Sequence, residues 1–380
     1  MPMACVRFAR FAVLFTMLVI FGSPVFAALP NKAAVLDSIS LVDDYWIKQH
    51  SSTGPDVWNN AVYHIGNLAA WSVTNNPAYL EYANTYAQKH SWLTYGNGKQ
   101  FHADNYAITQ VYLGLTSDAA KLAPTKMQTD VYFKNAGYDT KWTWVDAYFM
   151  QSAVFTKLGN LYGNAGANES DGGAGGSIAA GGDYHLQEWK MFDYMRTTLH
   201  LYDAGASNLW FRDSNYAYPW AKSRNGKKVL WSRGNGWVFA ALANNLESLP
   251  TTAPNYDIYK SIYLSMAESL IARQRADGFW NTNLDDADEY AGPETSGTAA
   301  FAYGMAIGIR KNWLDSATYM PVLEKAWNGM VTIAVQPNGF LGYVQTIGKA
   351  PDSTDRGTTA DFGVGLFLLA GSEVFKIAPP

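Results

Sequence analysis

The sequence predicts an all-α fold, a ring of six helical hairpins called an (α/α)6 barrel. Apolar residues recur at helical spacing along most of the chain, and the alternation typical of strands is scarce. Turns containing Trp or Phe also recur at intervals of roughly 60 to 70 residues, about the length of one helical hairpin with its loops. An open stack of hairpins would fit the same period, but the sequence offers no polar capping repeat for its ends. We therefore predict a closed ring.

Each predicted helix has apolar residues three and four positions apart, so that one face can be buried. In chain order, the predicted helices span residues 32–49, 57–72, 77–89, 104–114, 144–161, 186–201, 237–249, 258–274, 296–309, 319–333 and 361–374. The repeated turns follow three of them, at residues 208–210, 277–280 and 338–340. Any β structure is expected in such turns.

The chain reads as one domain, residues 28–380, because no Pro-rich or charged linker divides it. Residues 164–182 are the exception to the helical pattern. They are rich in Gly, Ala and Ser and lack periodicity, which predicts a flexible surface insertion.

Residues 1–27 read as a secretory signal peptide. Arg7 and Arg10 form a basic start, residues 11–21 an apolar run, and Ala27 ends a small-residue cleavage site. Cleavage would remove Cys5, the only cysteine, so the mature chain could form no disulfide and no cysteine-metal site. We expect a secreted or periplasmic protein with no membrane segment after cleavage.

Composition narrows the class of partner. Without the signal peptide the chain has 26 basic against 32 acidic residues, a net charge of −6, which makes nucleic acid an unfavourable partner. Aromatic residues make up 15% of the chain and charged residues only 16%. Such a balance is typical of carbohydrate-active enzymes, because sugar C–H faces pack on aromatic rings while sugar hydroxyls take directional hydrogen bonds.

Residues 231–237 (WSRGNGW) form the most informative motif, just before a predicted helix. The glycines let a planar group approach the main chain, and Trp231 and Trp237 offer faces to a sugar ring. Arg233 brings a fork of donors that matches a carboxylate. The alternative is that both tryptophans are core residues and Arg233 pairs with a structural carboxylate. The combination in one short turn favours a site for an acidic sugar.

Two acids stand at the starts of predicted helices. Asp146 lies among aromatic and apolar neighbours, Trp142 included, which would raise its pKa. Asp104 has His102 and an aromatic residue close by. If both helices are inner helices of the ring, the two carboxyl groups project into the same open end, and glycosidic chemistry commonly needs such a pair. Helix capping is the ordinary alternative for each Asp. We count Trp142 and His102 as candidate substrate contacts.

Three other polar clusters could bear on the function. Arg212 could present a second guanidinium to the same open end, although its neighbour Asp213 makes a local contact the ordinary interpretation. The acidic residues 285–289 lack the Gly and terminal Glu of an EF-hand and read as a solvated loop. The six histidines show no metal-ligand spacing, so we expect no metal and no cofactor. No serine-hydrolase elbow or nucleotide-binding loop is found.

With these residues in view, the chain resembles glycoside hydrolase family 105 and, more distantly, family 88, the unsaturated uronyl and rhamnogalacturonyl hydrolases. The resemblance covers most of the mature chain. Residues 144–150 (WVDAYFM) and 231–237 carry it, and residues 294–297 (ETSG) and 359–365 (TADFGVG) support it. It implies a single (α/α)6-barrel catalytic domain. It also implies an enzyme that follows a polysaccharide lyase and removes the 4,5-unsaturated uronic acid left at the non-reducing end of an oligosaccharide.

The resemblance also implies roles for individual residues. The family's acid/base falls on Asp146, which would protonate C4 of the double bond and activate water for attack at C5. The second essential acid falls on Asp104. The substrate-contacting turn falls on Trp231, Arg233 and Trp237, with Arg233 as the candidate for the uronate carboxylate and Arg212 as its helper.

Two positions depart from the family pattern. Many members have a histidine eleven residues before the catalytic acid, where this chain has Asn135, and a histidine where it has Arg212. Both positions bear on substrate specificity rather than on proton transfer.

Two other functions fit the same residues. One is an ordinary inverting glycosidase on this fold, such as an endo-mannanase, in which water attacks the anomeric carbon. The other is a non-catalytic glycan-binding protein whose aromatic open end only captures sugar. The polysaccharide, the linkage and the oligomeric state are not indicated by the sequence.

Overall fold

The structure, a computed structural model, describes residues 1, 28–98, 101–134, 137–162, 183–253 and 255–380. This part of the chain holds twelve α-helices. They are α1 (Lys32–Gln49), α2 (Trp58–Thr74), α3 (Pro77–Lys89), α4 (Ala103–Leu115), α5 (Ala119–Lys134), α6 (Asp146–Tyr162), α7 (Tyr184–Asp193), α8 (Ser232–Ser248), α9 (Tyr256–Ile271), α10 (Thr295–Arg310), α11 (Ser316–Gly329) and α12 (Asp361–Ile377).

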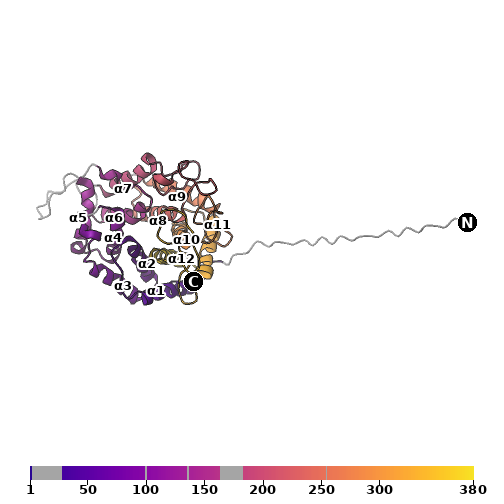
Figure 1. Ribbon diagram of the computed structural model, residues 1–380. Helices are drawn as coiled ribbons and strands as arrows, with labels where there is room; N and C mark the ends of the chain where they lie inside the picture. Colours follow the sequence, from indigo (N-terminus) through magenta and orange to yellow (C-terminus); the bar gives the residue numbers. More distant parts are fainter. Residues whose placement is uncertain (2–27, 99–100, 135–136, 163–182, 254) are drawn as a thin grey trace.

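The helices form a double ring. The even-numbered helices lie inside and the odd-numbered helices surround them (Figure 1). Each inner helix packs against the next, and α12 packs against α2, which closes the ring. The prediction of six helical hairpins in a closed ring is confirmed.

Ring closure depends on two glycines that face each other across α2 and α12. A Cβ on Gly66 would overlap the backbone of Gly365, and a Cβ on Gly365 would overlap the backbone of Val62. The two helices therefore touch through their main chains, and no side chain fits between them.

One helix, α5, was not predicted from the sequence. It holds Pro124 within its span, and proline removes a backbone donor and crowds the preceding turn, so the segment reads as broken. Its sequence also lacks a clear apolar stripe. The helix completes the second hairpin, whose inner helix α4 was predicted alone.

Among the described residues, the long connections lie at one end of the ring. Segments that lead from an outer to an inner helix, such as residues 199–231, 272–294 and 335–360, are long, whereas α2 and α3 are joined by residues 75–76 alone. They meet at the end where the inner helices begin, which we call the mouth. Loops that carry function concentrate on such a face.

The repeated turns occupy equivalent places at the mouth. Asn208, Gly278 and Gly339 each have positive φ, at 53°, 90° and 94°, and each follows an outer helix. A Cβ on Gly278 would overlap the backbone of Lys325, so this turn requires glycine. The β structure of the described residues is limited to isolated bridges, such as Trp280 with Glu294, in agreement with the expectation that it occurs near these turns.

Several predictions concern residues that the structure does not describe. The signal peptide from residue 2 onward, the insertion at residues 164–182 and Asn135 lie outside the described residues. Within the described ranges, no helix is long and apolar enough to cross a membrane.

Candidate active site

The two predicted acids come together at the mouth. Asp104 lies in the first turn of α4 and Asp146 in the first turn of α6, and these inner helices are neighbours in the ring. The side chain of Asp104 is 29% exposed and that of Asp146 is 13% exposed. Both carboxyl groups are thus partly sheltered and still reachable from the mouth.

Arg212 is brought to Asp146 by a short backbone pairing. The N–H of Val145 donates to the carbonyl of Arg212 at 2.9 Å, and Trp144 and Asp213 form an isolated bridge. The Arg212 Nε then lies 3.2 Å from Asp146 Oδ2, while its Nη1 donates to Asp213 Oδ2 at 2.6 Å. The predicted local contact with Asp213 and the predicted placement at the site are both present.

The pKa values of the two acids follow from this geometry. Burial and the nearby charge of Asp146 raise the pKa of Asp104 to about 7, and Arg212 opposes the rise. Burial also raises the pKa of Asp146, against the opposing charges of Arg212 and Arg233. Asp104 therefore keeps its proton into the neutral range, and because its pKa depends on the charge of Asp146 the two titrations are coupled.

A cavity of about 310 Å³ opens beside Asp104. Its lining comes from the starts of α2 and α4 and from the loop before α4: Val57, Trp58, Tyr95, His102, Asp104 and Asn105. His102 is an exposed residue that stacks on Trp144 with ring centroids 4.5 Å apart, and its Nδ1 lies 3.5 Å from Asp104 Oδ2. Burial and Arg212 lower the pKa of His102, so its imidazole is neutral at pH 7. Its predicted place beside Asp104 is observed.

Arg233 is closed off from solvent. The residue is 1% exposed, and its guanidinium lies between the rings of Trp231 and Phe362, with Cζ 4.5 and 4.6 Å from their centroids. It donates to the backbone carbonyls of Gln345 at 2.7 Å and Thr346 at 2.9 Å. The prediction that Arg233 clamps the uronate carboxylate directly does not fit this arrangement. Its positive charge instead opposes the rise in the pKa of Asp146.

Three tryptophans that were predicted to contact the substrate are core residues in the structure. Trp142 and Trp237 are fully buried, and Trp231 is 1% exposed. Trp142 donates its Nε1 to Gln151 and Trp231 donates its own to Gln345, each at 2.8 Å. No ring face of these tryptophans is exposed, so none of them can stack on a sugar. The alternative that Trp231 and Trp237 are core residues therefore holds.

The predicted turn at residues 231–237 is also wrong as local structure. Trp231 is the N-cap of α8, and Ser232 to Trp237 are already helical. The two glycines serve helix packing: a Cβ on Gly234 would lie 2.9 Å from the Trp231 ring, and one on Gly236 would lie 2.8 Å from the Cβ of Ala300 on α10.

The motif at residues 294–297 has a structural role as well. Glu294 is fully buried and caps α10, accepting from the backbone N–H groups of Ser296 and Gly297. It also accepts from the N–H of Gln345 at 3.2 Å, which fixes the loop that holds Arg233.

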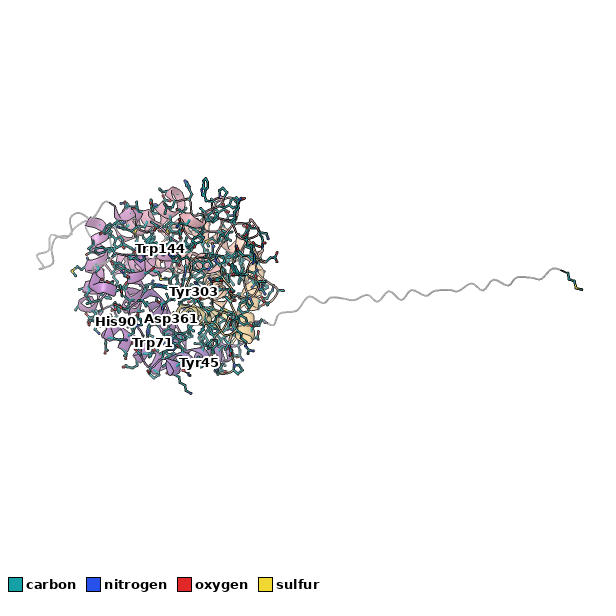
Figure 2. The ribbon with its side chains drawn as sticks, in the orientation of Figure 1. Tyr45, Trp71, His90, Trp144, Tyr303 and Asp361 are labelled. Atoms are coloured by element: carbon teal, nitrogen blue, oxygen red, sulfur yellow. The ribbon has the colours of Figure 1, made fainter. Side chains whose placement is uncertain are left out.

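Sequence reasoning missed residues that the same logic would have found. Trp58 begins α2 and lines the cavity, and Asp361 begins α12 and accepts a hydrogen bond from Asn59 at 2.6 Å. Asp361 lies toward the middle of the ring in Figure 2, and burial raises its pKa. The signal was their position, because every inner helix begins at the mouth.

The prediction that residues 285–289 form a solvated acidic loop is wrong for Asp286. Asp286 is fully buried and accepts hydrogen bonds from Ser223 and Asn225. In the described part of the chain, no group of three or more His, Cys, Asp or Glu side chains could hold a metal ion.

Fold and site together define a class, a carbohydrate-active enzyme with paired carboxyl groups at the mouth of a six-hairpin ring. The family model of Glycosyl Hydrolase Family 88 matches residues 38–378. The chain therefore belongs to glycosyl hydrolase family 88, and it is a glycosidase with a carbohydrate substrate. The non-catalytic alternative is thereby removed, and the closer likeness to family 105 stays a prediction.

Known proteins agree with this assignment. The unsaturated 3S-rhamnoglycuronyl hydrolase of Formosa agariphila is 30% identical over 360 residues, which cover 87% of this chain and 88% of that protein. A solved structure of a family 88 glycosyl hydrolase from Bacteroides vulgatus matches with a TM-score of 0.80 and 31% identity, covering 91% of this chain and 99% of the other. A structure described as a polysaccharide lyase matches with a TM-score of 0.82 and 34% identity, covering 91% and 98%.

Proposed function

We propose that the enzyme removes a 4,5-unsaturated uronic acid from the non-reducing end of lyase-generated oligosaccharides by hydrating the C4=C5 double bond. The observation that carries the proposal is the carboxyl pair Asp104 and Asp146, partly buried at the mouth beside Arg212. The unsaturated rhamnoglycuronyl hydrolase among the relatives supports the same substrate class.

The steps balance with one water molecule. The pair's proton passes from Asp146 to C4, and a water oxygen bonds to C5 while its proton returns to the carboxylate. The product is a hemiketal, whose C5–O5 bond breaks to leave a ketone at C5. The hemiacetal left at C1 then expels the rest of the oligosaccharide as an alcohol. Asp104 steers the ring and the water and keeps the shared proton available near neutral pH.

Arg212 is the guanidinium that reaches the substrate in this proposal. Its side chain is 17% exposed, whereas Arg233 is closed off by Trp231 and Phe362. Its Nε donates to Asp146 and its Nη1 to Asp213, and in this proposal its Nη2 donates to the uronate carboxylate. Arg233 then acts as a positioning residue that tunes Asp146 through its charge.

We also propose that residues 28–380 act as a single catalytic domain, and that residues 1–27 direct the protein to the periplasm or the exterior. The basic start, apolar run and small-residue site support this location. An enzyme that consumes lyase products would then work where polysaccharide is cut.

The test follows the ultraviolet absorbance of the conjugated double bond. Lyase digests of several acidic polysaccharides are incubated with the enzyme, and the absorbance is expected to fall for at least one of them. Constant absorbance in every digest, together with release of reducing sugar from saturated glycans, would instead indicate an ordinary inverting glycosidase.

A second candidate comes from the relative described as a polysaccharide lyase. A lyase creates the double bond that a hydrolase of this kind consumes, so the two activities change the absorbance in opposite directions. Uncut acidic polysaccharide is therefore incubated in parallel. We expect no rise in absorbance there, and a rise would favour the lyase.

A further inference from the structure

The loop at residues 214–228, which we call the Trp220 loop, starts at the active site. It follows Arg212 and Asp213 directly, and Asp213 accepts a hydrogen bond from the backbone N–H of Asn215 at 2.8 Å. The loop belongs to the connection between outer helix α7 and inner helix α8, so it lies on the mouth side of the ring. A ligand that extends out of the site on this side would meet it.

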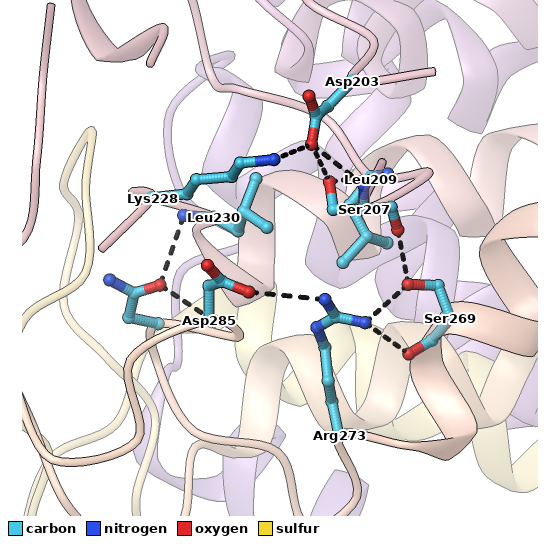
Figure 3. Close-up of polar contacts among 9 residues, drawn as sticks. Asp203, Ser207, Leu209, Lys228, Leu230, Ser269, Arg273 and Asp285 are labelled. Atoms are coloured by element: carbon cyan, nitrogen blue, oxygen red, sulfur yellow. Dashed lines mark hydrogen bonds and ion pairs between the residues drawn. The ribbon is translucent and has the colours of Figure 1, made fainter. Parts of the chain in front are cut away.

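The Trp220 loop is held in a fixed shape by the acidic side chains of Asp286, which is fully buried, and Asp203. Asp286 accepts from the Ser223 hydroxyl at 2.5 Å and from Asn225 at 3.1 Å, and Ser223 and Lys227 are joined by a backbone hydrogen bond of 2.9 Å. The base of the loop is tied by Lys228, whose Nζ contacts Asp203 (Figure 3). The loop is thus preorganised, which lowers the entropy cost of binding.

What this fixed loop presents to solvent is an aromatic and basic surface. Trp220 is 88% exposed and Tyr218 is 42% exposed, so neither ring contributes much to the core. Lys222 is exposed, with its Nζ 5.5 Å from the Tyr218 ring centroid, and it makes no ion pair with any described residue. In contrast, Lys228 and Lys227 face Asp203 and Asp286.

We propose that Tyr218, Trp220 and Lys222 bind a sugar unit that lies beyond the second residue of the oligosaccharide and carries an anionic group. The indole offers a flat face for the sugar ring, and the ammonium of Lys222 attracts a carboxylate or a sulfate ester on it. The occupant is inferred from three features: continuity with the site at Arg212, the exposed ring and the unpaired cation. The inference rests on the proposed function.

The test compares an unsaturated disaccharide with an unsaturated tetrasaccharide from the same acidic polysaccharide. In Trp220→Ala, KM for the tetrasaccharide should rise roughly three- to tenfold, the range expected for one aromatic contact, while kcat stays the same. KM for the disaccharide should not change. Lys222→Gln should act in the same direction, and its effect should shrink at high salt. Met127→Ala is the matched control, because Met127 is 65% exposed on outer helix α5.

The anionic group is identified with two tetrasaccharides, one that bears only carboxylates and one that bears a sulfate ester. Lys222 binds the group whose tetrasaccharide shows the larger rise in KM in Lys222→Gln. Equal KM values for wild type and Trp220→Ala on both would overturn the inference. If the wild-type enzyme turns over neither length, the proposed function has failed. In that case, calorimetry compares the affinities of wild type and Trp220→Ala for the tetrasaccharides, which tests the Trp220 loop by itself. Equal affinities would count against binding at this loop.

Discussion

At the scale of residues, the site is a pair of carboxyl groups with unequal surroundings. Arg212 touches Asp146 and favours its charge, whereas at Asp104 partial burial and the charge of Asp146 outweigh the more distant charge of Arg212. The pair therefore holds one proton into the neutral range. It can give that proton to a carbon and take one from water in the same cycle.

This arrangement predicts a pH dependence. Because the raised pKa of Asp104 is about 7, the pair loses its last proton as the pH rises through 7, and kcat/KM should fall about tenfold for each further pH unit. The measurement is the rate of absorbance loss between pH 5 and 9. In Asp104→Asn the rate should be much lower, and the fall near pH 7 should disappear. A variant that keeps the wild-type profile would assign the proton to another group.

The sequence indicated which acids lie together at the mouth, but not which side chains are exposed to solvent. Asp104 and Asp146 could be paired because both begin inner helices. The burial of Arg233 could not be foreseen, because its acceptor, the carbonyl of Gln345, is separated from it by 112 positions in the chain. A short motif cannot reveal a partner that tertiary folding supplies.

At the scale of elements, α8 shows how a glycine pattern can mislead. Glycines at 234 and 236 indicate a loop when they are considered alone. In the structure they lie in a helix, where the missing side chains let α8 approach Trp231 and α10. The apolar periodicity predicted the later part of α8 correctly. The first turns of the helix depend on close packing against other parts of the chain, which the local sequence does not reveal.

We therefore predict that Gly236→Ala destabilises the protein by about 1–3 kcal/mol, because its Cβ would lie 2.8 Å from that of Ala300. Helix propensity alone would favour alanine by about 1 kcal/mol. Gly114→Ala is the control, since this helical glycine on α4 meets only the flexible end of Leu68. Thermal unfolding of both variants is the measurement. Equal melting temperatures would show that α8 and α10 can separate freely.

At the scale of the whole molecule, the ring is closed by contact between the first and last inner helices. The repeat of helices and turns predicted the six hairpins, and the absence of a polar cap favoured closure over an open stack. The main-chain contact of Gly66 with Gly365 was beyond prediction, because it joins segments from opposite ends of the chain.

Because the ring is closed at Gly365, a side chain at this position should strongly destabilise the protein. A side chain there would overlap the backbone of Val62 and push α12 from α2, so Gly365→Ala should cost several kcal/mol, at the upper end of single substitutions. The measurement is the free energy of unfolding in urea. Gly371→Ala is the control, because a Cβ on this helical glycine of α12 would meet only side chains. A Gly365→Ala protein as stable as wild type would argue for an open array.

The central claim is that cleavage begins at the double bond, and two oligosaccharides that differ only in the C4=C5 bond of the terminal uronate test it directly. We expect the unsaturated compound alone to be cleaved, with one reducing end released for each double bond lost. Asp146→Asn should lower this rate by about 10²–10⁴-fold without changing the fold seen by circular dichroism. Equal cleavage of the saturated compound, or release of sugar while the double bond survives, would contradict the account.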